Sequence, residues 1–353
     1  ISPGFIDCHM HILIEEVAKD KEHVMTVSSP GGEMYPNADV AAVLRSVENC
    51  RKLLAAGFTT ILDGGGRNFA ECALKEAIKK EMVVGPELLV AGKQLTTNKA
   101  HFVGFSMEPY GPYGMRKAVR DLMWWGVDFI KMQMSPPIRL IGRNIDAVHF
   151  TLEEAQAAID EAHNYGVPVH AHLRGATAIK RFLQAGGDYV VHGTGMDEEG
   201  IEMMLEKKKI LLPTLLSPTP YPSQELVAAK PKEVLNNLAH IAEVQWESVR
   251  KAWEAGVKIA FSTDMGCLGN HIGENWREFF NLQEIGMSPC QALQSATSVA
   301  AEVVGRSHEL GQVKEGYVAN LVALKGNPLE DLSAVKQVAF TMVKGNMVYD
   351  GRS

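Results

Sequence analysis

The sequence predicts an α/β fold, a (β/α)8 TIM barrel with a small β-sheet appended to it. The first observation is a repeated module, in which a helical pattern ending in glycine precedes a short, nearly all-apolar strand, as at 183–193. Strands without polar alternation are buried on both faces, as in a parallel sheet covered by helices. The second observation is that eight such strands occur in 353 residues, a length that suits one large domain or two ordinary ones.

The predicted strands follow one another along the chain, and predicted helices connect them. Glycine at the end of a helix provides the left-handed cap from which the chain turns into the next strand. The eight strands are expected at 5–11, 58–63, 87–92, 128–134, 167–172, 188–193, 210–216 and 258–264. Their alternation with helices is the pattern of a closed parallel barrel.

After the eighth strand, the pattern predicts a helix over 289–305 and then β-like segments with glycine-marked turns at 311–328 and 338–351. We therefore divide the chain into a hydrolase barrel over 1–308 and the C-terminal part of a small β subdomain over 309–353. A few strands alone make a poor independent fold, so we expect the other strands of this sheet upstream of Ile1.

Composition limits the classes of function. The net charge is −7 and no basic stripe is present, which argues against nucleic-acid or anionic-membrane binding and favours a small-molecule substrate. Five scattered cysteines without CxxC spacing indicate neither a disulfide framework nor a thiolate zinc site. No apolar run approaches the roughly 18 residues of a membrane span. We expect a cytoplasmic protein that forms a homo-oligomer.

The first strand, FIDCHMH, carries polar residues at alternate positions. Period-two geometry predicts that Asp7, His9 and His11 share one face and that Ile6, Cys8 and Met10 share the other. In a filled barrel, that polar face is expected to point inward at the C-terminal end of the strand. The histidines are either metal ligands or ordinary hydrogen-bonded histidines, and the strand alone does not decide between the two.

Further polar residues lie at or near the C-terminal ends of later strands, where active sites form in this architecture. They are Lys131, His170, His172, His192 and Asp264. Imidazoles and a carboxylate suit zinc and similar divalent ions. By contrast, His163 and His240 lie within helical patterns, which is typical of surface or helix-packing residues.

Lys131 needs a different explanation, because an ammonium group cannot bind a cation. Burial in an apolar strand would lower its pKa and leave a nucleophilic amine. Such an amine can add carbon dioxide to form a carbamate, whose two oxygens can bridge two metal ions. The alternatives are a lysine that packs in the barrel mouth and pairs with an acid, or a Schiff-base lysine.

Several motifs resemble those of the amidohydrolase superfamily, in the branch of imidazolonepropionase-related hydrolases and zinc-dependent Xaa-Pro or Xaa-Arg/Lys dipeptidases. PGFIDCHMH is similar to the PGxIDxHxH opening of that branch, DFIKMQM to its carboxylated-lysine strand, and VPVHAH to its fifth-strand ligand. VVHG is similar to its EHG, FSTD to its GTD, and HIGENWREF to the HG…E segment after the eighth strand. ALQSAT and LGQVKEGYVANLVAL resemble its C-terminal motifs. The resemblance spans nearly the whole chain.

The resemblance implies two divalent metal ions, with zinc expected, and a carbon dioxide-derived carbamate on Lys131 as N6-carboxylysine between them. It implies His9, His11 and Asp264 on one metal and His170 and His192 on the other. His172 is then expected to contact substrate or support a ligand. Three features depart from the family pattern: VVHG lacks the glutamate, Asn320 replaces an aspartate, and MSPPIRLIG follows the lysine where the family often has a glycine pair.

The implied reaction is hydrolysis of an amide-type bond in a dipeptide, N-acyl amino acid, urea or carbamate by a metal-bridging hydroxide, with Asp264 as the proton shuttle. Asp7 is expected to orient a ligand. The candidates for substrate binding are His101, His172, Arg174 and His271, although Arg174 could instead form a surface ion pair. The alternatives are a mononuclear deaminase of the same superfamily, a Schiff-base lyase that uses Lys131, and a non-catalytic scaffold.

Overall fold

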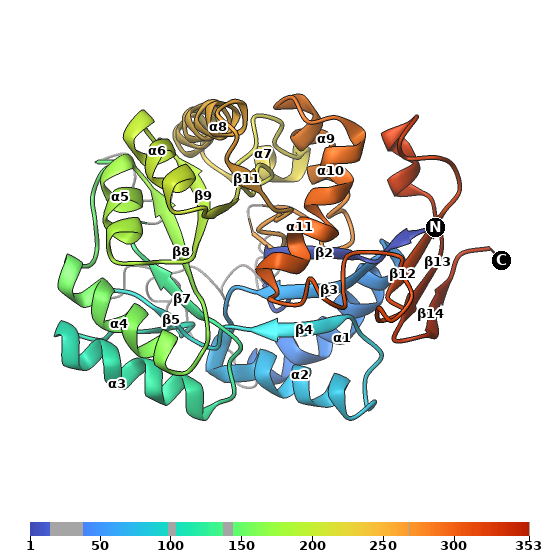
Figure 1. Cartoon of the computed structure of the whole chain (residues 1–353), viewed down its shortest axis with the longest axis horizontal. Coiled ribbons are helices and arrows are strands. Elements are labelled where there is room, and N and C mark those ends of the chain that lie inside the picture. The colour runs from blue at the N-terminus through green and yellow to red at the C-terminus, as the bar shows by residue number, and fades with distance from the viewer. Residues whose placement is uncertain (15–37, 98–103, 137–143, 268, 353) are drawn as a thin grey trace.

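A computed structural model describes residues 1–14, 38–97, 104–136, 144–267 and 269–352, and it confirms the predicted barrel (Figure 1). Parallel strands form the centre, and helices cover them on the outside. The barrel strands are β2 (Phe5–Met10), β3 (Phe58–Asp63), β4 (Glu87–Val90), β5 (Gln94–Leu95), β7 (Ile130–Gln133), β8 (Val169–Arg174), β9 (Tyr189–Thr194), β10 (Ile210–Leu212) and β11 (Lys258–Ile259). A two-residue strand, β6 (Ser106–Met107), pairs with β5.

The strands form two hydrogen-bonded sheets, in the orders β2-β3-β4 and β11-β10-β9-β8-β7-β5-β6. The third predicted strand, 87–92, corresponds to β4, and Gly92, which has a φ of +70°, lies between β4 and β5. Backbone hydrogen bonds of 2.9 Å connect the two sheets, from Asp128 N–H to the Val90 carbonyl and from Cys8 N–H to the Phe261 carbonyl. These bonds close the sheets into a barrel.

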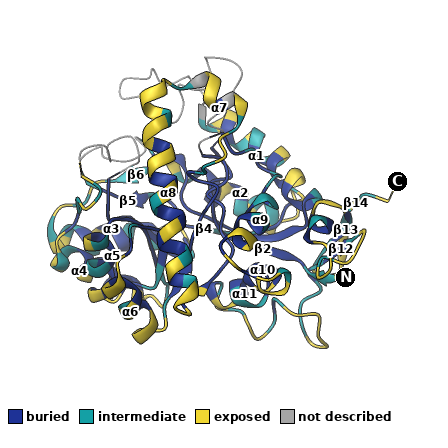
Figure 2. Cartoon of the chain, turned by 90° about the horizontal axis from the view of Figure 1, so that it is seen from above, coloured by how far each residue is buried: buried dark blue, intermediate teal, exposed yellow. Residues whose placement is uncertain are grey.

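The helices lie outside the strands, with their buried faces inward and their outer faces exposed (Figure 2). They are α1 (Ala38–Ala55), α2 (Ala70–Lys79), α3 (Gly111–Trp124), α4 (Leu152–Asn164), α5 (Ala176–Gln184), α6 (Glu198–Glu206), α7 (Gln224–Ala229), α8 (Lys232–Glu254), α9 (Arg277–Glu284), α10 (Pro289–Ser295) and α11 (Ser298–Val303). The local sequence explains where several of these helices begin. For example, Thr151 and Glu154 form a capping box at the start of α4. No helix within the described ranges is long and apolar enough to cross a membrane.

The single helix predicted over 289–305 is instead two helices, α10 and α11, separated at Thr297. The reason is that two carbonyls at the break accept hydrogen bonds from barrel strands. The Ser295 carbonyl accepts from Phe261 N–H at 3.0 Å, and the Ala296 carbonyl accepts from Ile6 N–H at 2.8 Å. A tertiary contact therefore overrides the helical pattern, and α11 packs against the apolar residues that fill the barrel interior.

The small sheet lies at one side of the barrel, beside the N-terminus (Figure 1). Its order is β1-β12-β13-β14, all antiparallel, and its strands are β1 (Ser2–Pro3), β12 (Leu321–Leu324), β13 (Val338–Val343) and β14 (Asn346–Asp350). Ser2–Pro3 pairs with Leu321–Val322, so the segment that precedes β2 contributes a strand to this sheet. The expectation of further strands upstream of Ile1 stays a prediction.

Thr341 attaches the small sheet to the barrel, because its buried hydroxyl donates a hydrogen bond of 2.7 Å to the Leu54 carbonyl at the end of α1. Thr341→Val keeps the shape but removes this hydrogen bond, so the Leu54 carbonyl keeps only the one from Gly57 N–H at 3.1 Å. We expect a loss of about 1 kcal/mol in the free energy of unfolding, measured by urea titration. The control Thr177→Val, at an exposed site on α5, should change it by less than about 0.5 kcal/mol. Equal stability of the two variants would contradict this role.

Candidate metal centre

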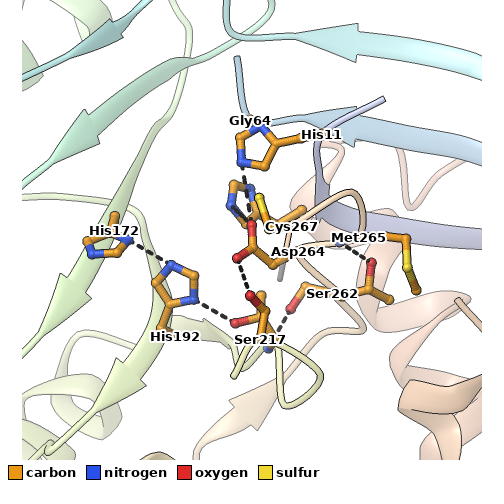
Figure 3. A network of polar contacts seen from close by, with 12 residues as sticks. His11, Gly64, His172, His192, Ser217, Ser262, Asp264, Met265 and Cys267 are labelled. Carbon is orange, nitrogen blue, oxygen red and sulfur yellow. Dashed lines mark hydrogen bonds and ion pairs between the residues drawn. The ribbon is translucent and has the colours of Figure 1, made fainter. Parts of the chain in front are cut away.

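Two histidines, one at the end of the first barrel strand and one just after it, lie close to an aspartate that follows the eighth strand. Figure 3 shows His11 and Asp264 of this cluster. The Oδ1 atom of Asp264 lies 3.5 Å from His9 Nε2 and 3.4 Å from His11 Nε2. One ligand atom from each residue lies within 4.8 Å of the others, and all three residues are buried. Two imidazoles and a carboxylate suit zinc and similar divalent ions. The described residues thus contain a His–His–Asp cluster that could hold a divalent metal.

Backbone pairing between the first and last strands brings this cluster together. The His9 carbonyl accepts hydrogen bonds from the N–H groups of Thr263 at 3.1 Å and Asp264 at 2.8 Å, and the Met265 carbonyl accepts one from His11 at 2.9 Å. Asp264 itself has a φ of +54°, in the left-handed region that non-glycine residues rarely adopt. Residues some 250 positions apart are therefore held next to each other by main-chain bonds.

The prediction that Asp7 shares the inward face of the first strand with His9 and His11 is wrong. Ile6 and Cys8 belong to the apolar cluster inside the barrel, together with residues of the other strands, whereas Asp7 turns the other way. Its Oδ2 atom accepts hydrogen bonds from Thr263 Oγ1 at 2.6 Å and Asn275 Nδ2 at 2.8 Å. The strict alternation fails because the pairing of β2 with β3 shifts register between Asp7 and Met10.

Asp7 nevertheless supports the cluster through the main chain. Its Oδ1 atom accepts hydrogen bonds of 3.2 Å from the backbone N–H groups of His9 and Thr263. Burial raises the pKa of the Asp7 carboxyl to about 7, although these bonds oppose the shift. The side chain thus holds the two backbone segments that carry the cluster.

Lys131 lies beside the cluster, with its Nζ atom 3.2 Å from His9 Nε2 and a side chain that is 1% exposed. Burial lowers its pKa from 10.5 to about 7, and the negative charge of Asp264 opposes that shift. The prediction of a lowered lysine pKa agrees with this geometry. Near neutral pH, a substantial fraction of the amine is unprotonated and nucleophilic.

His170 is completely buried, and its ring lies close to Phe129 and Tyr189, with centroid distances of 4.3 Å and 4.7 Å. Neither ring nitrogen has a hydrogen-bond partner within the described part of the chain, and the same holds for His9 Nδ1. Burial lowers the pKa of His170 well below its usual range, so the ring is neutral. A neutral, unpartnered imidazole is a suitable metal ligand, and buried polar groups normally have partners.

His192 and His172 form a hydrogen-bonded pair, in which His192 Nε2 lies 2.9 Å from His172 Nδ1. His172 Nε2 faces the Pro136 carbonyl at 3.3 Å, and His192 Nδ1 faces Thr214 Oγ1 at 2.6 Å. Because a carbonyl only accepts, a neutral His172 carries its proton on Nε2 and accepts from His192 on Nδ1. In this arrangement the lone pair of His192, on Nδ1, accepts a hydrogen bond from the Thr214 hydroxyl. Binding of a metal by His192 would therefore require it to change hydrogen-bond partners.

A polar chain holds the other oxygen of Asp264. Ser217 Oγ donates to Asp264 Oδ2 at 2.8 Å (Figure 3). The Ser217 carbonyl accepts from Arg174 Nη2 at 3.3 Å. Arg174 Nη1 also donates to Thr194 Oγ1 and Gln245 Oε1, each at 2.7 Å. Burial lowers the pKa of Arg174 to about 10, so it stays charged at neutral pH.

The surface ion pair that we considered for Arg174 is therefore wrong, because its side chain is 1% exposed and its guanidinium donates to neutral acceptors. His271 is half-buried in the loop after β11 and does not belong to the His9–His11–Asp264 cluster. His101 lies outside the described residues. Sequence reasoning missed Ser217, Gln94 and Gln133, although Gln133 follows Lys131 by two positions and so shares its strand face.

Known proteins resemble this chain in sequence and in fold. Residues 1–348 match the model of the amidohydrolase family. The ochratoxinase of Aspergillus niger is 29% identical over 385 aligned residues, which cover 99% of this chain and 76% of that protein. A solved Xaa-Pro dipeptidase with bound methionine in the active site has a TM-score of 0.86 and 29% identity, covering 99% of this chain and 86% of that chain. A prolidase complexed with N-methylphosphonate-L-proline has a TM-score of 0.84 and 28% identity, with the same coverage.

The chain belongs to the amidohydrolase family, because the family match extends over nearly its whole length. It is a metal-dependent hydrolase that acts on carbon–nitrogen bonds. The family resemblance inferred from the sequence motifs is thereby confirmed.

The pKa of Lys131 predicts a pH dependence of stability in metal-free protein without carbon dioxide. Between about pH 7 and 10, the unfolded chain keeps the lysine proton and the folded chain has lost it, so stability rises with pH. The rise is at most about 1.4 kcal/mol per pH unit. Lys131→Met should lack this slope, whereas the control Lys207→Met, at an exposed site, should keep it. Parallel pH profiles of melting temperature for wild type and Lys131→Met would contradict the prediction.

Proposed function

We propose that the protein hydrolyses an amide-type carbon–nitrogen bond in a small substrate, and that a dipeptide or N-acyl amino acid is the first candidate. The observation that carries the proposal is the buried His9–His11–Asp264 cluster, in which Ser217 holds the carboxylate. The similarity to a Xaa-Pro dipeptidase supports a dipeptide, and the similarity to an ochratoxinase leaves other amides open. Ureas and carbamates are further candidates.

We infer a binuclear site, with zinc as the first metal to test. His9, His11 and Asp264 would hold one ion, His170 and His192 the other, and a carbamate on Lys131 would lie between them. The unpartnered ring nitrogens of His170 and the lowered pKa of Lys131 support this set. Bound divalent ions would supply an activated water and polarise the substrate carbonyl.

Asp264 would move the proton in this reaction. One oxygen faces the histidines, and the other accepts a hydrogen bond from Ser217, so the carboxylate has a defined orientation in a buried site. It would take a proton from the attacking water and deliver it to the leaving nitrogen. Asp7 would support this geometry through the backbone of His9 and Thr263, and Arg174 through the carbonyl of Ser217.

The substrate would enter from the loops at the same end of the barrel. His101, His172, Arg174 and His271 remain candidates for contact with it. The Nη atoms of Arg174 donate to Thr194, Gln245 and Ser217, whereas its Nε atom has no hydrogen-bond partner among the described residues. Arg174 could still attract an anionic substrate through its charge. A homo-oligomer and a cytoplasmic location also remain proposals.

A mononuclear deaminase of the same family is the second candidate. One observation favours it, since His9, His11 and Asp264 are the single set of three suitable ligand atoms found close together in the described ranges. His192 also has both ring nitrogens engaged. The number of metal ions per chain separates the two candidates, because a binuclear hydrolase needs two and such a deaminase needs one.

Metal removal tests the first proposal. Dialysis against a chelator should abolish hydrolysis of dipeptide and N-acyl amino acid libraries, and zinc, manganese or cobalt should restore it. Metal content measured by mass spectrometry should approach two ions per chain in the active protein. Full activity in metal-free protein would refute the proposal, and one ion per chain with release of ammonia would favour the deaminase.

Asp264→Asn tests the proton shuttle. The amide cannot accept a proton, so kcat should fall by about 100-fold to 10,000-fold in protein that remains folded. Metal content must be measured in parallel, because the substitution also weakens a ligand. The exposed Asp160→Asn on α4 is the matched control and should leave kcat within about twofold. A metal-loaded Asp264→Asn protein with normal kcat would exclude this role.

A further inference from the structure

Two buried glutamines form a short hydrogen-bonded chain beside the metal centre. Gln94 belongs to β5 and Gln133 to β7, and their side chains are at most 2% exposed. Gln94 Nε2 donates to the Gly64 carbonyl at 3.0 Å, and Gln133 Nε2 donates to Gln94 Oε1. These contacts fix the positions of both amides.

The direction of this chain is determined by its first acceptor. A backbone carbonyl only accepts, so Gln94 must turn its NH2 group toward Gly64 and its oxygen toward Gln133. Gln133 must then offer an N–H to that oxygen, which turns its own oxygen away. Gln133 Oε1 has no hydrogen-bond partner in the described part of the molecule. Flipping either amide would bring two donors or two acceptors together.

The unpartnered oxygen belongs to the barrel strand that carries Lys131. Gln133 follows Lys131 by two residues at the C-terminal end of β7, so the two side chains share the inward strand face. The other end of the chain lies against the cluster, because a Cβ atom added to Gly64 would be 2.3 Å from His9 Cε1 and 3.0 Å from His11 Cε1. The main chain of Gln133 is held as well, since its carbonyl accepts from His149 Nδ1 at 3.2 Å.

We propose that Gln133 Oε1 accepts a hydrogen bond from an N–H group of the substrate and so selects substrates that carry one beside the scissile bond. A buried acceptor without a partner is unfavourable, and a ligand that supplies a donor removes that penalty. The donor is either the α-ammonium group of a dipeptide or the N–H of the scissile amide. This inference rests on the proposed amide hydrolysis.

Four matched compounds separate these two donors. Alanylalanine carries both, alanyl-N-methylalanine has only the ammonium group, propionylalanine has only the amide N–H, and propionyl-N-methylalanine has neither. We would measure kcat/KM for each compound with metal-loaded wild type and Gln133→Leu. Any compound that is not hydrolysed is titrated calorimetrically to obtain Kd. Absence of turnover would thus contradict the proposed function, while the binding data would still test Gln133.

Gln133→Leu should reduce kcat/KM or affinity only for the compounds that carry the group bound by Gln133 Oε1. We expect a reduction of about 3- to 10-fold if that group is the neutral amide N–H, and of more than about 10-fold if it is the ammonium group. The compound without either donor should be unaffected. The melting temperature and metal content of Gln133→Leu, measured in parallel with wild type, check that a loss does not reflect misfolding. An equal loss of kcat/KM or affinity for all four compounds would show a purely structural role for Gln133. No loss for any compound would show that water satisfies the oxygen. Either result overturns the inference.

Discussion

The junction between the first and last barrel strands is the interaction on which the site depends. The His9 carbonyl accepts hydrogen bonds from both Thr263 and Asp264, which closes the barrel and brings Asp264 next to His9 and His11. The carboxylate of Asp7 reinforces the junction from its other side by binding the N–H groups of His9 and Thr263. The same hydrogen bonds thus join the first and last strands and assemble the cluster. The site therefore cannot form in a chain that has not closed its barrel.

Burial determines the chemistry of the residues around this junction. Water is excluded, so charged forms of Lys131 and His170 are disfavoured, and both groups tend toward the neutral state in which a lone pair is available. Arg174 keeps its charge because the normal pKa of a guanidinium group is very high. Its Nη atoms donate hydrogen bonds to Thr194, Gln245 and the Ser217 carbonyl. Neutral imidazoles, a neutral amine and one oriented carboxylate are suited to bind cations, and His192 would have to change hydrogen-bond partners to join them.

Much of the fold and part of the site could be predicted from sequence. The all-apolar strands and glycine-capped helices indicated the barrel, and the positions of Lys131, His170, His192 and Asp264 at strand ends indicated the active end, because side-chain period and strand direction are local properties. The break at Thr297 and the direction of Asp7 were mispredicted. Both arise from contacts with distant segments, the first from Phe261 and Ile6, the second from a register shift against β3.

The pattern of residues along the chain therefore established which side chains are available at the barrel mouth, since this depends on the order of strands and on alternation within each. It did not establish their partners. Ser217 reaches Asp264, His172 reaches His192, and Gln133 reaches Gln94 across strands and loops far apart in sequence. Whether a buried polar atom is satisfied or left with a free lone pair depends on packing in three dimensions. That distinction separates the nitrogens of His192, which have partners, from those of His170, which have none among the described residues, and it is set by tertiary structure alone.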